Sequence, residues 1–371
     1  MAEHKIEIVK ISVTAHPKAD KLELAHIFGW QCVVGKDQFK TDDLAVYFPV
    51  DSVWITAEKA VEDIGETPAS YLSKLRLKSI RLRGEISQGL LISVPEGKNW
   101  KEGKDVTDCF SATKYVQPPE RGSGQNVVRF RKRNPNFAKY TDIENIKRYH
   151  DSIPTGTPVR ITRKIHGQNF RAGWVKKGTN VKGWWAMFKL KLSNLFGGEY
   201  EWCVGSHNMR VNEDSTGYHA RASRMLGLKE KLVKHKGLVV YGEVYGPKLQ
   251  DITYGVNQGE IGARIFDIRN VELLKENEAG NDYFSTKEFD SLCAELELPQ
   301  VPILFEGKYK GISQVKKQAD SRTSFDTDEI IEGAVVEAAE PDHSWSPGKG
   351  RLKYKYITDA YYLRKNGTEF K

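Results

Sequence analysis

The sequence predicts an α+β protein of two domains, a small β-barrel followed by a larger domain that contains strands and helices. Its 371 residues exceed what a single core usually holds, so two domains are the natural expectation. Short β-type segments, separated by Pro, Gly and Asp clusters, fill the first 110 residues, and longer apolar strands begin after residue 153. We therefore expect a barrel domain over residues 1–110, a linker over 111–150 and a second domain over 151–371.

Composition and charge narrow the classes of protein to consider. Hydrophobic residues make up 39% and charged residues 29% of the chain, which is typical of a soluble globular protein. The net charge of +8 favours a polyanionic partner only weakly, because lysine-rich surfaces are common. No run of about 18 apolar residues is present, and the opening MAEHKIEIVK has no apolar core. We therefore expect neither a membrane span nor export.

The cysteines are far apart in the sequence, at Cys32, Cys109, Cys203 and Cys293. They form no C-x-x-C pair, which argues against a zinc ribbon and against a disulfide framework. A protein of the reducing cytoplasm fits this pattern best. The sequence gives no sign of a stable protein partner.

Six short segments of the first domain have the composition of β-strands. They are residues 6–13, 22–28, 31–34, 44–48, 80–83 and 89–94. Several short strands within about a hundred residues are typical of a small barrel. HPKADKLE (residues 16–23) and CVVG (residues 32–35) also resemble the OB-fold tRNA-binding modules that are appended to synthetases. Such barrels commonly bind oligonucleotides on one face, but a purely structural role is equally open.

The stretch between the domains is rich in turn residues and basic side chains. PPERGSG (residues 118–124) is typical of a linker, and RFRKR (residues 129–133) fits a solvated tether or contact with an RNA backbone equally well. Residues 145–150 predict a short helix. Further along, lysines alternate with aromatic residues over 182–191, where an amphipathic helix packed on the protein's own core is favoured over binding of single-stranded RNA.

A candidate nucleophile lies at the start of the second domain. Lys164 begins the sequence KIHGQNF, after the alternating segment VRIT and just before a glycine. A lysine amine becomes a nucleophile only when it loses its proton, and positive neighbours, a metal ion or burial can lower its usual pKa of about 10.4. Taken alone, K-x-x-G is more typical of a surface lysine, so the interpretation depends on other segments.

Two downstream strands each carry one acidic residue beside glycine. Glu243 lies within GLVVYGEVYG, where a buried and unpaired charge would be costly. Its partner could be a ribose hydroxyl, a metal-bound water or a basic side chain, and a salt bridge at the strand end is the structural alternative. Glu332 lies in IIEGAVV in the same arrangement. Together the two carboxylates could hold a divalent cation through its waters, as Mg²⁺ prefers.

Two further segments carry groups suited to a nucleotide. Phe266 lies in ARIFDI; it could stack on a purine, although an aromatic residue in a strand usually belongs to the core. In RLKYKY, Lys353 and Lys355 point to one face of a strand and the tyrosines to the other. Neighbouring ammonium groups repel each other unless an anion lies near them, and phosphate is the obvious candidate. The alternative is the charged outer face of an edge strand.

In combination, KIHG, YGEVYG, RIFDI, IEGAVV and RLKYK, in this order over about residues 150–360, resemble the covalent nucleotidyltransferase superfamily. It contains ATP-dependent DNA and RNA ligases and mRNA capping enzymes. Histidine at the third position of KIHGQNF resembles the phage-type RNA-repair ligases. A leading OB-like barrel resembles the RNA ligases of the Deinococcus and Naegleria type. The resemblance implies an ATP-grasp-like ligase catalytic domain of antiparallel sheets with flanking helices.

The resemblance also implies a reaction in three steps. Lys164 attacks the α-phosphorus of ATP and releases pyrophosphate, the AMP passes to an RNA 5′-phosphate, and an RNA 3′-hydroxyl then displaces AMP. The implied cofactors are ATP as AMP donor and Mg²⁺ or Mn²⁺. The implied partner is nicked or broken RNA, with or without a DNA or RNA template, in RNA repair. A capping-type or DNA-joining enzyme and a non-catalytic RNA-binding relative are the alternatives.

The resemblance assigns a role to each matched residue. Glu243 contacts the ribose, Phe266 stacks on adenine, Glu332 orients metal-bound water, and Lys353 and Lys355 hold the α-phosphate and help to lower the pKa of Lys164. The two carboxylates are therefore also the expected metal ligands.

Three further assignments rest on weaker matches. His166 and Asn169 would contact the pyrophosphate or the RNA end. Arg210 is the preferred phosphate ligand in SHNMR, a segment in which His207 stands where the family usually has arginine.

Overall fold

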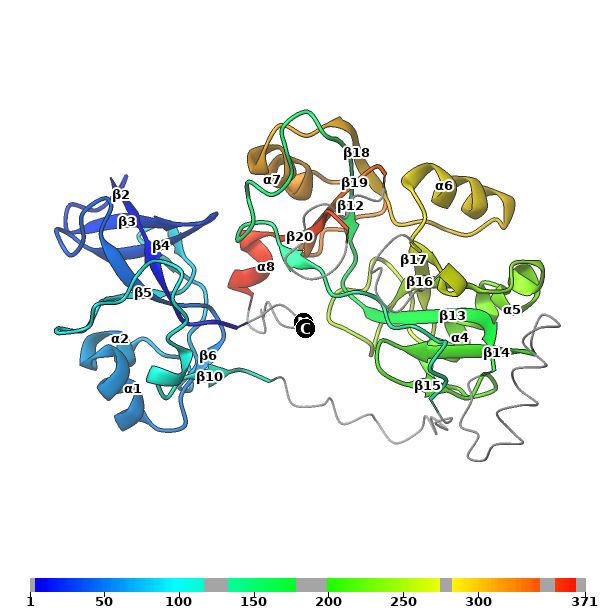
Figure 1. Cartoon of the computed structure of the whole chain (residues 1–371), viewed down its shortest axis with the longest axis horizontal. Helices are drawn as coiled ribbons and strands as arrows, with labels where there is room; N and C mark the ends of the chain where they lie inside the picture. The colour runs from blue at the N-terminus through cyan, green and yellow to red at the C-terminus, as the bar shows by residue number, and fades with distance from the viewer. Residues whose placement is uncertain (1–3, 117–132, 178–198, 274–281, 341–350, 365–371) are drawn as a thin grey trace.

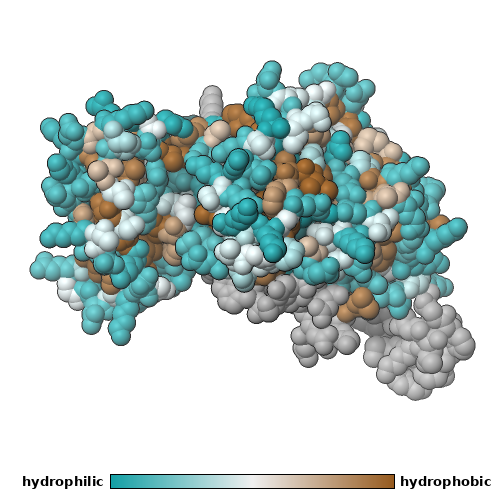
Figure 2. All heavy atoms as spheres, turned by 90° about the horizontal axis from the view of Figure 1, so that it is seen from above, coloured by the Kyte–Doolittle hydropathy of each residue, from teal (hydrophilic) through white to brown (hydrophobic). Residues whose placement is uncertain are grey.

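The computed structural model describes residues 4–116, 133–177, 199–273, 282–340 and 351–364 and shows a barrel domain beside a larger domain (Figure 1). Nearly all strand pairs are antiparallel and helices flank the sheets, so the predicted α+β fold is confirmed. No helix within these ranges has the length and apolar character needed to cross a membrane. On the face shown in Figure 2, hydrophilic residues predominate, with apolar residues in small groups between them.

The first domain is built from short strands. They are β1 (Glu7–Lys10), β2 (Ser12–Ala15), β3 (Leu22–Ile27), β4 (Trp30–Gly35), β5 (Leu44–Phe48), β6 (Ser52–Val53), β7 (Ile80–Leu82), β8 (Glu85–Ser87), β9 (Leu90–Ser93) and β10 (Thr113–Lys114). The main sheets have the orders β1-β5-β9 and β2-β3-β4. Each of the six predicted segments contains a strand, but residues 6–13 divide into β1 and β2, which pair with different neighbours. Alternate positions of β4 are buried, as one face of the sheet covers the barrel core.

Two helices of the first domain, α1 (Ala57–Ile64) and α2 (Glu66–Ser70), were not predicted from the sequence. Helix α1 begins after Thr56, whose side chain accepts a hydrogen bond from the backbone amide three residues later. It ends at Gly65, which has a φ of 86°. Only Ala60 and Ile64 of α1 are buried.

The second domain contains two five-stranded sheets. One has the order β11-β20-β19-β12-β18 and the other β15-β14-β13-β16-β17. Their strands are β11 (Glu144–Asn145), β12 (Pro158–Lys164), β13 (Gln168–Lys176), β14 (Tyr200–Ser206), β15 (Arg210–Val211), β16 (Leu238–Tyr245), β17 (Gly262–Asn270), β18 (Ile303–Lys308), β19 (Gly333–Ala338) and β20 (Lys353–Ile357). The chain passes from the first sheet to the second between β12 and β13, which is where KIHGQNF lies.

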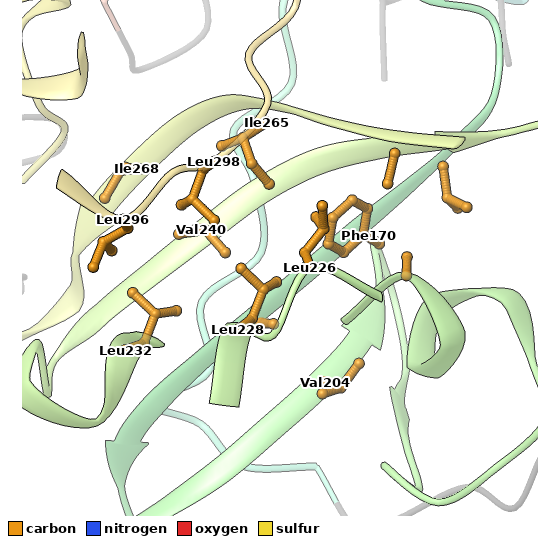
Figure 3. Packing of buried hydrophobic residues seen from close by; sticks show 14 of the residues in the cluster. Phe170, Val204, Leu226, Leu228, Leu232, Val240, Ile265, Ile268, Leu296 and Leu298 are labelled. Atoms are coloured by element: carbon orange, nitrogen blue, oxygen red, sulfur yellow. The ribbon is translucent and has the colours of Figure 1, made fainter. Parts of the chain in front are cut away.

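Helices cover one face of each sheet. They are α4 (Tyr218–Met225), α5 (Leu228–Lys231), α6 (Thr286–Glu295), α7 (Ile312–Asp320) and α8 (Asp359–Leu363). The largest core lies between β13, β14, β16 and β17 and the helices α4 to α6, and Figure 3 shows Phe170, Val240 and Leu228 meeting there. A second core lies under α7, where Val315 packs with strand residues such as Tyr354. The opposite face of the β13–β17 sheet is left for the site.

The stretch expected as a linker differs from the prediction in its described half. Residues 145–150 are not a helix but the end of β11 followed by turns, because the side chain of Asn145 accepts a hydrogen bond from the amide of Lys147 at 3.0 Å and so competes with helical pairing. Phe137 is buried against the second domain. The predicted segments 118–124 and 182–191, and nearly all of the basic run 129–133, lie outside the described residues.

The two domains meet at the turn between β3 and β4. The amide of Gly29 donates to the carbonyl oxygen of Lys147 at 2.6 Å, and a Cβ atom at Gly29 would lie only 2.9 Å from the Lys147 backbone. Lys147 Nζ reaches back to Gln88 Oε1 at 3.1 Å. Arg148 pairs with Glu7 at 2.6 Å. The barrel is therefore held by both backbone and side-chain bonds to the segment that precedes the second domain.

Candidate active site

Lys164 lies where the chain crosses between the two sheets of the second domain. It is the last residue of β12 and pairs with Gly333 of β19, and β13 begins four residues later. Gly167 permits the crossing, because a Cβ atom there would lie 2.3 Å from the carbonyl oxygen of Val244. The backbone thus fixes the position of the lysine from both sheets.

Lys164 forms an ion pair with Glu332. The lysine Nζ lies 2.7 Å from Glu332 Oε1; the lysine side chain is 25% exposed and the glutamate side chain 6% exposed. Strand register explains this contact, since Glu332 directly precedes Gly333, the strand partner of Lys164. Burial alone would raise the pKa of Glu332, but Lys164 and His166 lower it to about 2, so this carboxylate is ionised at neutral pH.

A second carboxylate approaches Lys164 from the other sheet. Glu243 lies on β16 opposite Asn169 of β13. Burial raises the pKa of Glu243 to about 8, with Lys164 opposing and Glu332 adding to the increase. Burial lowers the pKa of Lys164, but Glu332 and Glu243 outweigh it, and the pKa of Lys164 is raised. The lysine is therefore a cation here, and Glu243 is the group that titrates near neutral pH.

The two carboxylates have the chemistry of a water-mediated cation site. Glu332 Oε2 is buried and makes no hydrogen bond to the described part of the chain; it lies 3.6 Å from His166 Nδ1. Such an oxygen can accept a hydrogen bond from water on a Mg²⁺ ion, which keeps several of its waters. The described residues contain no group of three or more His, Cys, Asp or Glu side chains that could hold a metal directly.

His166 is buried by side chains from later in the chain. Its ring Nε2 lies 2.8 Å from Asp251 Oδ1, and Nδ1 lies 3.0 Å from the Tyr361 hydroxyl. Its backbone amide donates to the hydroxyl of Tyr254 at 2.7 Å. Arg364 donates to Asp251 at 2.8 Å and to the Tyr361 hydroxyl at 2.7 Å. We call these five residues the His166 clasp.

The clasp changes what is expected of His166. Contact with pyrophosphate or an RNA end was predicted, but the residue is 2% exposed and both ring nitrogens face protein groups. The ring instead lies beside Glu332, where it lowers the pKa of that carboxylate. The geometry thus suits a residue that positions Glu332 rather than one that touches the substrate. Arg364 and Tyr361 act on the lysine site only through this ring.

Asn169 and Phe266 lie on the face of the β13–β17 sheet that is left open by the helices. Asn169 Oδ1 is buried and makes no hydrogen bond to the described residues. Phe266 is half-buried, meets Tyr140 edge-on with ring centroids 4.9 Å apart, and packs against the small core that contains Ile165. Alternation along β17 turns Ile265 into the main core and leaves Phe266 on the side of Glu243.

Lys353 and Lys355 occupy the strand face that was predicted, with the tyrosines of β20 in the opposite core. However, Lys353 Nζ lies 2.9 Å from Asp267 Oδ2 and 2.8 Å from Glu337 Oε2. The prediction that these two lysines lower the pKa of Lys164 is wrong for this arrangement, because that pKa is raised. The physical reason is that carboxylates neutralise Lys353, while two others surround the nucleophile.

Arg210 does not meet the role preferred for it. Its guanidinium forms two bonds to the carboxylate of Glu201, at 3.0 and 2.8 Å, and a third to the carbonyl oxygen of Trp202. Glu201 lies on the neighbouring strand β14, a contact that the sequence spacing did not reveal. A guanidinium held in this bidentate way is a structural link between strands. His207 is nearby at the surface, with its Nε2 3.9 Å from Asp142.

Several groups in and around the site were not predicted from the sequence. Asp267 accepts hydrogen bonds from Lys353, Tyr140 at 2.8 Å and Arg351. Burial would raise the pKa of Asp267, but Arg351 and Lys353 lower it. Asp267 directly follows Phe266 in RIFDI, and regular alternation would place the two side chains on opposite faces. A bulge in the pairing of β17 with β16 brings both to the same side, which the sequence did not reveal. The His166 clasp offered no signal, because its members are separated by up to about two hundred residues.

Fold and site together define a two-domain enzyme whose lysine, flanked by two carboxylates, lies between two antiparallel sheets. A family model described as RNA ligase matches residues 157–355, more than half of the chain, and a model described as an OB-fold domain matches residues 5–94. The chain belongs to the RNA ligase family. It is therefore an enzyme of the ligase class whose substrate is RNA. No curated protein matches the sequence.

Solved structures of an RNA ligase from Naegleria gruberi share the whole fold. The form with PPi has 22% sequence identity and a TM-score of 0.71, over 97% of this chain and 98% of that one. A variant with ATP and Mn has 23% identity and a TM-score of 0.72 over the same shares. A variant with AMP and Mn has 22% identity and a TM-score of 0.72, again over 97% and 98%. The order of barrel and catalytic domain is thus common to both proteins.

Proposed function

We propose that this ligase seals RNA 3′-hydroxyl and 5′-phosphate ends with ATP as the AMP donor and Lys164 as the nucleophile. The observation that carries the proposal is Lys164 at the sheet junction, with Nζ 2.7 Å from Glu332 and with Glu243 on the opposite strand. ATP is supported by the forms of the Naegleria gruberi enzyme that contain ATP or AMP.

The first step forms a covalent bond between protein and AMP. Lys164 Nζ attacks the α-phosphorus of ATP, the N–P bond forms, and the bond to the bridging oxygen breaks as pyrophosphate leaves. The amine must first lose a proton, whereas Glu332 and Glu243 raise the pKa of Lys164. Binding of ATP must therefore weaken the Lys164–Glu332 ion pair. Glu243, with its pKa of about 8, can change its own proton occupancy at the pH of the reaction.

The next two steps use the same site. An oxygen of the RNA 5′-phosphate attacks the phosphorus of the lysyl-AMP, and the N–P bond breaks to return the amine. The 3′-hydroxyl oxygen of the other end then attacks that 5′-phosphate, and AMP leaves. Both steps need positioning and neutralisation of charge rather than new covalent groups.

Nearby side chains are placed to bind the nucleotide. Phe266 presents a half-buried ring for the adenine, and Asn169 offers a buried amide oxygen beside Glu243. Lys355 lies on the same strand face as Lys353 and is assigned to the α-phosphate with it. For Lys353 this assignment requires release of Asp267 or Glu337 when the nucleotide binds.

We assign the divalent cation to Glu332 and Glu243, which would hold it through its waters. When bound, Mg²⁺ or Mn²⁺ supplies positive charge that neutralises the phosphates. Mn accompanies ATP and AMP in the Naegleria gruberi structures. The orphaned Oε2 of Glu332 is the atom of this chain that best supports the assignment.

We assign the enzyme to RNA repair, on nicked or broken strands with or without a DNA or RNA template. The four cysteines are free thiols, which is consistent with a reducing cytoplasm. A stable protein partner is not part of the proposal.

The decisive experiment is adenylylation with labelled ATP, followed by mass mapping of the modified peptide. Wild type is expected to carry one AMP on Lys164, and Lys164→Ala none. Lys229→Ala is the matched control, since that side chain is 45% exposed on α5. Label on another residue, or persistent label on Lys164→Ala, would sink the assignment. Labelling by GTP alone would favour a capping-type reaction, and sealing tests on RNA and DNA nicks separate the joining enzymes.

A further inference from the structure

A cavity of about 310 Å³ lies between the barrel and the second domain, away from Lys164. The barrel contributes Phe28, Trp30 and Gln88 to its wall. The segment that precedes the second domain contributes Lys147, and α7 of the second domain contributes Lys316. In Figure 1, α7 and α8 lie on the side of the second domain that faces the barrel. The pocket therefore exists only because the two domains are docked.

Gln88 gives the pocket a hydrogen-bond donor that the protein leaves unused. The residue is 2% exposed, and its backbone is held on both sides: its amide donates to Gln31 at 2.8 Å, and its carbonyl oxygen accepts from the Tyr47 hydroxyl at 3.0 Å. Its side-chain Oε1 accepts from Lys147 Nζ at 3.1 Å. Its Nε2 is buried and makes no hydrogen bond to the described residues. A buried donor without an acceptor is costly, which points to an acceptor on a ligand.

The pocket also has an aromatic wall and a cationic rim. Phe28 is 39% exposed at the tip of the β3–β4 turn, and its ring meets Trp30 edge-on at 6.2 Å. Lys147 is buried between Gln88 and Asp359, with its Nζ 3.2 Å from that carboxylate. Lys316 lies at the rim with its side chain 55% exposed and its Nζ 3.8 Å from the other oxygen of Asp359, so two lysines share this one carboxylate. The three features, a ring to stack on, an amide donor and a nearby cation, are those with which proteins bind a nucleobase and its phosphate.

We propose that this interdomain pocket binds one nucleobase of the RNA substrate. The base stacks on Phe28, a carbonyl oxygen or ring nitrogen of the base accepts from Gln88 Nε2, and the adjoining phosphate lies near Lys316. An RNA strand is favoured over an enclosed metabolite because the pocket opens between two domains of an RNA ligase and has a cationic rim. The inference rests on the proposed function, since it names a second contact for the same RNA.

The pocket and the lysine site share helix α8. Asp359 at the start of α8 pairs with Lys147 in the pocket wall, and Tyr361, two residues later, belongs to the His166 clasp. A base in the pocket thus lies against an element that also supports Glu332. This arrangement would let the enzyme hold a strand at a distance from the phosphate that reacts.

The test measures binding of nicked RNA to the full chain by fluorescence anisotropy. Phe28→Ala removes the stacking ring, and Gln88→Glu removes the donor but keeps an oxygen for Lys147. Stacking on one aromatic ring predicts an increase in Kd of roughly 10-fold for Phe28→Ala. Tyr71→Ala, at an exposed ring of the same domain, is the control and should leave Kd unchanged. Thermal melting checks that each variant is folded.

A crosslinking arm separates RNA from free nucleotides. RNA with 5-iodouridine beside the nick should crosslink to Phe28 or Trp30, and excess unmodified RNA should compete whereas UMP at equal nucleotide concentration should not. Wild-type Kd values in both folded pocket variants, or equal competition by UMP, would overturn the inference. Lysyl-AMP formation by wild type is measured in parallel. Its absence would defeat the proposed function, whereas lysyl-AMP with unchanged RNA binding would defeat the pocket alone.

Discussion

Replacing Glu243 with glutamine should change how the stability of the second domain depends on pH. The folded protein raises the pKa of this carboxyl from 4.5 to about 8, mainly through burial. Between these two values the folded state holds a proton that the unfolded state has lost. The contribution of this carboxyl to the free energy of unfolding is therefore fully present below pH 4.5 and is lost as the pH rises through 8. Glutamine, which carries no titrating proton, should remove this loss.

The size of the effect follows from linkage. One pKa unit corresponds to about 1.4 kcal/mol, so wild type should lose about 2 kcal/mol relative to Glu243→Gln between about pH 6.5 and 9. Glu332 does not contribute in this window, because its pKa of about 2 confines its titration to acid. Residues that titrate equally in both proteins cancel in the difference.

The assay is urea unfolding of both proteins at several pH values between 6.5 and 9, with circular dichroism and tryptophan fluorescence as the two signals. Coincidence of the two signals checks that one transition is measured in this two-domain chain. Glu66→Gln, at an exposed glutamate of the barrel, is the matched control and should follow wild type. If Glu243→Gln and wild type keep a constant difference from pH 6.5 to 9, the carboxyl does not titrate near neutrality and this account of the site fails.

Three other substitutions probe other parts of the structure. Glu332→Gln should lose lysyl-AMP formation and cost about 3 kcal/mol of stability at pH 7; the deficit should vanish as pH falls from 4.5 to 2, which acid unfolding measures. Arg210→Lys breaks the bidentate bond to Glu201 and should lower the free energy of unfolding in urea by about 1 to 3 kcal/mol. A large rise in the KM for ATP without loss of stability would contradict the structural role of Arg210. Gly167→Ala places a methyl group 2.3 Å from the Val244 carbonyl oxygen, so we expect a lower Tm and impaired adenylylation; a wild-type Tm would show that the crossing tolerates a side chain.

The sequence predicted best those features that depend on a single strand, namely its position in the chain and the face on which each side chain lies. Alternation placed Lys353 and Lys355 on one face, and the apolar pattern identified the strands that carry Glu243 and Phe266 and the strand that follows Glu332. These features follow from the two-residue period of a strand, which needs no knowledge of its partners. The meeting of Lys164 with both carboxylates depends on register, and that was reached only through resemblance to a family.

Contacts between distant segments could not be predicted. Lys353 and Arg210 each form an ion pair with a carboxylate from another strand. These partners are Asp267 for Lys353 and Glu201 for Arg210. The His166 clasp unites residues from three parts of the chain. The prediction of a helix over 145–150 was wrong because the side chain of Asn145 accepts a hydrogen bond from the backbone amide of Lys147, and composition alone does not show this contact.

The two carboxylates beside Lys164 come from different sheets, Glu332 from the residue just before β19 and Glu243 from β16. The proton affinity of the lysine is therefore a property of the angle between two rigid layers rather than of the sequence around it. A small rotation of one layer would separate one carboxylate from the amine while the other stays in place. A substitution far from Lys164 could therefore change the reactivity of the lysine if it alters how the two sheets pack. The pKa of Lys164 thus depends on how the two sheets of the second domain are packed.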